Sequence, residues 1–127
     1  MITKETRQKV LQKFNGHCAY CGKKVEKLQV DHIFPKNRVH WLENEVVRKR
    51  QNLDFTDIND IKNLFPACGR CNRYKSDFLL EEFRSQINKQ VERARKNSWN
   101  FVCAEDFGFI KIIDKPVIFY YEQLREV

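Results

Sequence analysis

The sequence predicts an α+β fold built around two cysteine pairs and one short apolar strand. Cys18/Cys21 and Cys68/Cys71 each enclose two residues, the spacing of a zinc knuckle. Between them, Val30–Pro35 reads Val-Asp-His-Ile-Phe-Pro, a β-prone run that places an acid and an imidazole on opposite faces of a strand. Helical apolar patterns flank this region on both sides. We therefore expect helices around a small sheet that a metal ion pins to a distant segment.

Size and charge limit what the chain can be. Its 127 residues suit one domain, and a hydrophobic content of 42% with ten Phe provides a core and argues against general disorder. The net charge of +7 favours a polyanionic partner such as nucleic acid, although such a charge can also be merely solubilising. The N-terminus lacks the apolar region of a signal peptide and no stretch is long enough to span a membrane, so we expect a cytoplasmic protein whose cysteines stay reduced. Cys103, outside the pairs, is expected to be a small hydrophobe.

The first half of the chain supplies the expected core. Thr3 to Phe14 is predicted to be a helix with Thr3 as its N-cap and Asn15-Gly16 as its stop. Leu28 to Phe34 is the expected first strand, which ends at Pro35 because proline has no N–H for a ladder. Trp41 to Arg50 is compatible with a short helix. Asn63 to Ala67 is the second strand, and the helix of the metal motif starts from Cys71.

The second half is expected to extend that core. A long helix from about Leu79 to Lys96 has apolar residues at steps of three and four. Phe107 to Ile113 and Val117 to Tyr121 are β-rich runs joined by Asp114-Lys-Pro116, which predicts a C-terminal hairpin. We expect one domain over 1–127, with a core at about 14–80 and an extension over 79–127.

Cys18, Cys21, Cys68 and Cys71 provide the four thiolates that tetrahedral zinc requires. Such a zinc would be structural, because four protein ligands leave no position for water, and it would contribute to folding. The other interpretation is two coincidental thiol pairs. His17 precedes the first pair but is surplus to the ligand set.

Residues between the knuckles, together with one directly after the second knuckle, fit phosphodiester hydrolysis. Neutral His32 can act as a general base near neutral pH. Asp31 offers a hard oxygen ligand for a divalent cation, and Asn72 offers a second one without added charge. Taken singly, these residues have ordinary explanations, since an Asp-His pair is commonly a surface pair and an Asn after a knuckle is commonly a helix cap.

The order Asp31-His32, Asn63-Leu64, Cys68-Gly-Arg-Cys71-Asn72-Arg-Tyr-Lys75 resembles the HNH endonucleases, whose core is the ββα-metal fold. The resemblance covers roughly Cys18 to Lys75. It implies that His32 is the general base, that Asp31 and Asn72 hold a catalytic Mg²⁺ or another divalent cation, and that Asn63 braces the loop carrying the histidine. The chain has Asn72 where the family name has its last His, which leaves the preferred metal open, and Ser76 where a glycine is common.

The expected activity is metal-dependent cleavage of DNA, most simply double-stranded DNA, with a separate partner as one source of sequence specificity. Two other functions are compatible with parts of the sequence: a non-catalytic zinc module that binds nucleic acid, and a protein–protein adaptor. Neither requires Asp31, His32 and Asn72 together. The candidate phosphate contacts are Arg73, Lys75, Lys36 and Arg38, with further basic charges at Arg48-Lys49-Arg50 and on the outer face of the long helix.

Overall fold

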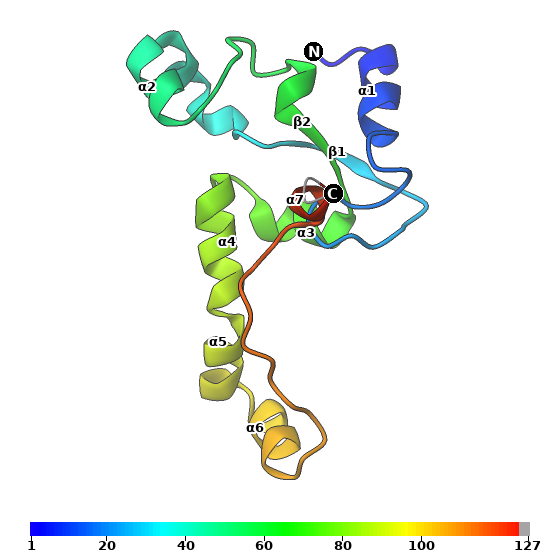
Figure 1. Ribbon diagram of the computed structural model, residues 1–127, viewed down its shortest axis with the longest axis vertical. Helices are drawn as coiled ribbons and strands as arrows, with labels where there is room; N and C mark the ends of the chain where they lie inside the picture. Colours follow the sequence, from blue (N-terminus) through cyan, green and yellow to red (C-terminus); the bar gives the residue numbers. More distant parts are fainter. Residues whose placement is uncertain (125–127) are drawn as a thin grey trace. The chain divides into compact units, whose positions relative to one another are not determined.

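A computed structural model describes residues 1–124 of the chain (Figure 1). The chain divides into two compact units. The first comprises Met1–Leu80 together with the C-terminal segment from Ile118 onward, and the second comprises Glu81–Val117. Both cysteine pairs and the Asp31-His32 pair belong to the first unit. Among the described residues, no helix is both long and apolar enough to cross a lipid bilayer.

The described part of the first unit contains a sheet of two antiparallel strands, β1 (Gln29–His32) and β2 (Leu64–Ala67), which lie side by side in Figure 1. Their register pairs Asp31 with Phe65 and His32 with Leu64. Helix α3 (Gly69–Lys75) follows β2 directly and packs against β1. Strand, strand and helix are therefore the elements that the sequence predicted, although both strands are shorter than predicted and the helix begins at Gly69, before the predicted Cys71.

Helix α1 (Lys4–Leu11) starts at the predicted cap, where the Thr3 hydroxyl accepts the Thr6 N–H at 3.1 Å. It ends before the predicted Asn15-Gly16 stop, and both of these residues have positive φ, 53° and 86°. The first knuckle follows. Gly22 must be glycine there for two reasons: its φ is 79°, and an added Cβ would lie 2.8 Å from the Tyr120 ring.

The predicted C-terminal hairpin is wrong. Residues 107–119 form no strand, and Tyr120–Gln123 form a short helix, α7. The backbone N–H groups of Tyr120 and Tyr121 donate to the carbonyls of Tyr20 and Ala19 at 3.0 and 2.9 Å. Phe119 and Tyr121 are buried by this docking, and their rings contact Tyr20 and Phe65. The apolar residues of this segment thus cover the first knuckle instead of pairing as strands.

The connection between the strands has its own small core. A 3₁₀ segment, η1 (Lys36–Glu43), leads into helix α2 (Glu45–Arg50), and a second 3₁₀ turn, η2 (Ile61–Asn63), precedes β2. The side chains of Phe34, Leu42 and Phe55 are buried together beneath these elements. The connection is therefore a packed structure that can hold side chains in fixed positions.

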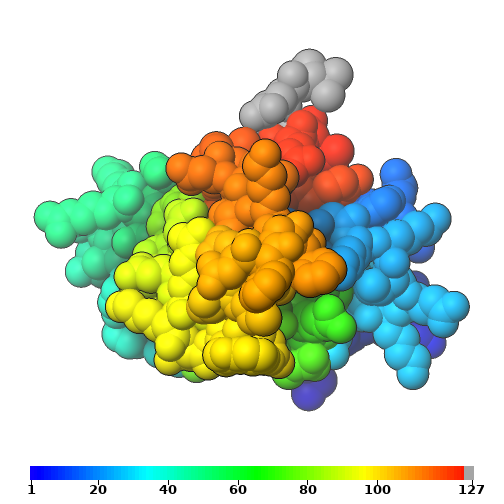
Figure 2. Space-filling view, turned by 90° about the horizontal axis from the view of Figure 1, so that it is seen from below, coloured from blue at the N-terminus to red at the C-terminus, as the bar shows by residue number. Residues whose placement is uncertain are grey.

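In the second unit, the predicted long helix is divided at Lys89 into α4 (Leu80–Asn88) and α5 (Gln90–Asn97). A further helix, α6 (Trp99–Asp106), which the sequence did not predict, is capped by the Ser98 hydroxyl. Arg95 of α5 donates twice to Glu105 of α6, at 3.0 and 2.7 Å. The yellow and orange side chains of this unit lie against one another in Figure 2.

Candidate active site and metal centre

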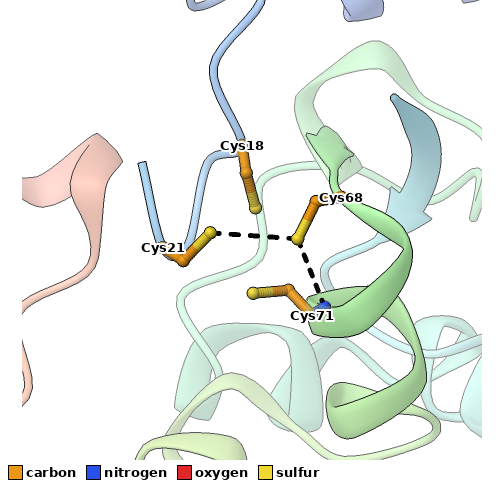
Figure 3. A group of neighbouring side chains, drawn as sticks. All are labelled: Cys18, Cys21, Cys68 and Cys71. Carbon is orange, nitrogen blue, oxygen red and sulfur yellow. Dashed lines mark hydrogen bonds between the residues drawn. The ribbon is translucent and has the colours of Figure 1, made fainter. Parts of the chain in front are cut away.

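The four predicted cysteines converge on one point. Their sulfur atoms all lie within 4.8 Å of one another, and the Cys21 and Cys68 sulfurs are 3.8 Å apart. A tetrahedron with Zn–S bonds of about 2.3 Å has S–S edges of about 3.8 Å. Figure 3 shows the side chains pointing toward a common centre, two from the loop after α1 and two from the start of α3. This cluster is consistent with a zinc site.

The chemistry of these donors also fits a cation. Hydrogen bonding from Cys71 lowers the pKa of Cys18 to about 4, whereas the proximity of Cys18 raises the pKa of Cys71. Four thiolates this close repel one another, so a central cation is what would let all four ionise. The backbone N–H of Cys71 also donates to the Cys68 sulfur at 3.4 Å. His17 lies outside the cluster, and its Nδ1 is 2.9 Å from the Gly22 carbonyl oxygen.

A separate pocket of about 190 Å³ lies beside α3. It is lined by three of the four predicted catalytic residues, Asp31, His32 and Asn72, but not by Asn63. The other lining residues are Val30 of β1, Pro35 and Lys36 after β1, and Ser76 and Asp77 after α3. Asp31 and His32 come from β1 and Asn72 from α3, so the contact between strand and helix brings them together. Ser76 ends α3 with a φ of 45°, the left-handed conformation that glycine adopts most easily.

Asp31 is held by two donors. Its carboxylate is 5% exposed, and Oδ2 accepts the Tyr20 hydroxyl at 2.5 Å and lies 3.4 Å from Lys75 Nζ. Burial raises the pKa of Asp31, while Lys75 and Tyr20 act in the opposite direction. Both contacts use Oδ2, so Oδ1 is the oxygen that could bind a metal. Asn72 has a comparable arrangement, since its Nδ2 donates to Gln29 at 2.6 Å and its Oδ1 is the atom that could bind a metal.

His32 is half-buried and has one defined partner. Its Nε2 lies 2.8 Å from Asn59 Oδ1, an amide oxygen 27 residues further along the chain. Burial lowers the pKa of His32, and the hydrogen bond to Asn59 opposes that shift. The imidazole is therefore mainly neutral at pH 7, the form that can accept a proton.

Asn63 is almost fully buried, and its side chain joins two segments. Its Oδ1 accepts the Phe34 N–H at 2.7 Å, and its Nδ2 donates to the carbonyls of Phe34 and Ile58 at 3.1 and 2.9 Å. Its own carbonyl accepts the Ile33 N–H at 2.9 Å. The backbone that directly follows His32 is thus tied to the turn before β2.

The predicted phosphate contacts have different environments. Arg73 and Lys36 are exposed, and the Arg38 guanidinium lies 5.2 Å from the centre of the Trp41 ring. The prediction that Lys75 contacts phosphate is wrong. Its side chain is fully buried, with Nζ donating to the His32 carbonyl at 2.8 Å, so it has no surface to offer a phosphate. Its role in this structure is to neutralise Asp31.

Three further basic residues lie near the second knuckle and were not predicted as phosphate contacts. A groove of about 500 Å³ beside the second knuckle is lined by Lys23, Lys27 and Arg70, with Glu26 as its acid. Gly69 and Arg70 of this groove belong to α3, the helix that also carries Asn72. Tyr20 and Asn59 were missed as well. The only local signal for Asn59 is the Asp57-Ile-Asn sequence, which is typical of a turn that an Asp side chain stabilises.

Two short strands and a helix, joined to a four-cysteine cluster and presenting an Asp-His pair, have the arrangement of a ββα-metal core. Residues 18–78 match the family model described as HNH endonuclease, and this segment is an HNH endonuclease domain.

The chain is 33% identical over 96 residues to the SPbeta prophage-derived putative HNH endonuclease YoqL of Bacillus subtilis strain 168. The match covers 74% of this chain and 38% of the relative, so the chain corresponds to well under half of that protein. No solved structure matches the chain.

Proposed function

We propose that the chain is a metal-dependent endonuclease that hydrolyses phosphodiester bonds of double-stranded DNA. The observation that carries this proposal is the shared pocket, in which a neutral imidazole, a carboxylate and a carboxamide from β1 and α3 meet. Such an oxygen-donor set suits Mg²⁺ or another divalent cation. The cysteine cluster would hold a structural zinc ion, separate from this chemistry.

Each residue has a distinct task in the proposed mechanism. Asp31 and Asn72 would hold the divalent cation, which would supply Lewis-acid stabilisation of the phosphate when bound. Lys75 and Tyr20 keep Asp31 ionised despite its burial. His32 accepts the proton of the attacking water. Asn63 fixes the backbone on which His32 is presented.

The basic surface supports DNA as the substrate. Lys36 lines the pocket, Arg73 is exposed on α3, and the Lys23/Lys27/Arg70 groove adjoins the other end of the same helix. Helix α3 has 7 residues and is therefore about 10 Å long, roughly the rise of three nucleotides of one strand. A single DNA backbone could then contact both the pocket and the groove. Sequence specificity would come from outside these elements, for example from a partner.

A plasmid-nicking assay with three proteins tests the proposal. His32→Ala removes the base and touches neither the cysteines nor the proposed metal ligands, so zinc content and DNA binding should be unchanged while cleavage falls by about 10²–10⁴-fold. Asn72→Ala should also lose cleavage, and extra Mg²⁺ or Mn²⁺ should partly restore it. No metal concentration should restore His32→Ala, because the missing group is a proton acceptor. Cleavage by His32→Ala at the wild-type rate would refute the proposal.

A further inference from the structure

The imidazole of His32 has two nitrogens, and the structure distinguishes them. Nε2 lies 2.8 Å from Asn59 Oδ1. A carboxamide oxygen can only accept a hydrogen bond, so Nε2 must carry the proton. In the neutral ring the lone pair is then on Nδ1, and Nδ1 is the atom that can take a proton from water.

Asn59 is itself fixed by a turn. Its backbone N–H donates to Asp57 Oδ1 at 2.9 Å, and the Asp60 N–H donates to the Asp57 carbonyl at 2.9 Å. The carbonyl of the preceding residue, Ile58, accepts a hydrogen bond from Asn63 Nδ2 at 2.9 Å. The backbone from which the Asn59 side chain extends is thus held by this turn.

The same Asn63 amide also binds the backbone of Phe34, two residues after His32. One buried side chain therefore sets the distance between the two partners of the His32–Asn59 hydrogen bond. Residues 57–60 belong to the connection between β1 and β2, which has a buried core of its own. This part of the connection is placed to act on the active-site imidazole.

We propose that Asn59 is a positioning residue that selects the Nε2–H tautomer of His32 and fixes the rotation of its ring. This inference rests on the proposed function, in which His32 is the general base. Without the amide oxygen, the neutral imidazole divides between two tautomers and turns more freely, so fewer molecules present the Nδ1 lone pair. Loss of the hydrogen-bond partner that orients a metal-bound histidine lowers activity by about 10–100-fold, and we expect an effect of similar size for His32.

Two substitutions separate the hydrogen bond from the bulk of the side chain. Asn59→Leu keeps the size and removes the acceptor, whereas Asn59→Asp keeps an acceptor oxygen in the same place. The first measurement is ¹⁵N NMR of the imidazoles without added Mg²⁺, at a pH high enough for neutral rings, with the His32 signals identified by their absence in His32→Ala. Wild type and Asn59→Asp should show the Nε2–H tautomer, and Asn59→Leu should show a mixture.

The second measurement is single-turnover cleavage of duplex DNA. Asn59→Leu should cleave about 10–100-fold more slowly with unchanged DNA binding, and Asn59→Asp should stay within a few-fold of wild type. An Nδ1–H tautomer in the wild-type protein would overturn the inference, even if Asn59→Leu failed to fold. The inference would also be overturned if Asn59→Leu had the same His32 tautomer and the same cleavage rate as wild type. Wild-type protein that cleaves no DNA would refute the proposed function instead, and the NMR result would still decide the tautomer.

Discussion

The buried ion pair between Lys75 and Asp31 leads to a strong prediction about stability. Lys75→Met keeps most of the side-chain volume and removes the ammonium group. The Asp31 carboxylate, 5% exposed, would then retain only the Tyr20 hydroxyl, and the His32 carbonyl would lose its 2.8 Å donor. Removing one partner of a buried pair costs about 3–5 kcal/mol, because the remaining charge is left buried without compensation. For a chain of this size, the midpoint of thermal unfolding should fall by roughly 10–20 °C.

The loss of stability in Lys75→Met should depend on pH in a defined direction. Burial already raises the pKa of Asp31, and Lys75 is the largest influence that lowers it. In Lys75→Met the folded-state pKa of Asp31 therefore lies further above the unfolded value of about 3.9. The folded state then binds the proton more tightly, so its stability decreases as the pH rises above that unfolded value. The difference from wild type should be largest at neutral pH and should shrink as the pH falls toward about 4.

Urea unfolding between pH 4 and 8, without chelator or added Mg²⁺, measures these changes. Arg73→Met is the matched control, because Arg73 is exposed on the same helix, and it should change stability by no more than about 0.5 kcal/mol. The double variant Lys75→Met/Asp31→Asn removes both charges and should recover about 2 kcal/mol or more. A loss below about 1 kcal/mol for Lys75→Met, or no recovery in the double variant, would show that the pair does not act as described.

Two further outcomes are expected. Purified protein should contain about one zinc per chain by elemental analysis. Cys68→Ser should lose both the metal and most of the fold, because Cys68 contributes a ligand and also caps α3. Folded wild-type protein without zinc would contradict this prediction. Asn63→Ala should destabilise the fold by about 3 kcal/mol or more in chemical unfolding, because it leaves several buried backbone groups at Phe34 and Ile58 without partners. A change below about 1 kcal/mol would mean that water or a rearranged backbone replaces the amide.

The features that the sequence predicted correctly are those encoded by local spacing. The cysteine pairs, the strand that carries Asp31 and His32, and the Thr3 cap all depend on residues a few positions apart. Hydrogen bonds between distant segments leave no such pattern. Lys75 is indistinguishable from a surface lysine until α3 folds back onto β1, and nothing in the sequence near His32 indicates Asn59 as its partner.

The errors in the C-terminal half have physical reasons. Phe119 and Tyr121 alternate as in a strand, but the segment is buried against the knuckle and its N–H groups bind the carbonyls of Tyr20 and Ala19. The first part of α6 contains Trp, Phe, Val and Cys, which are weaker helix formers, and the better formers Ala104 and Glu105 come only near its end, so the Ser98 cap is the main local signal at its start. The interruption at Lys89 has neither glycine nor proline to mark it.

The docking of Phe119–Tyr121 on the first knuckle has a consequence for the order of folding. During synthesis the whole HNH domain, residues 18–78, emerges about 40 residues before the aromatic side chains that cover Tyr20 and Phe65. Until then the Ala19 and Tyr20 carbonyls lack the N–H groups of Tyr121 and Tyr120, and the Phe65 ring of β2 lacks its contact with Tyr121. Tyr20, which contacts Phe119 of that late segment as well as Phe65, also donates to Asp31. The surroundings of the Tyr20–Asp31 hydrogen bond are therefore complete only after the C-terminal segment has been made.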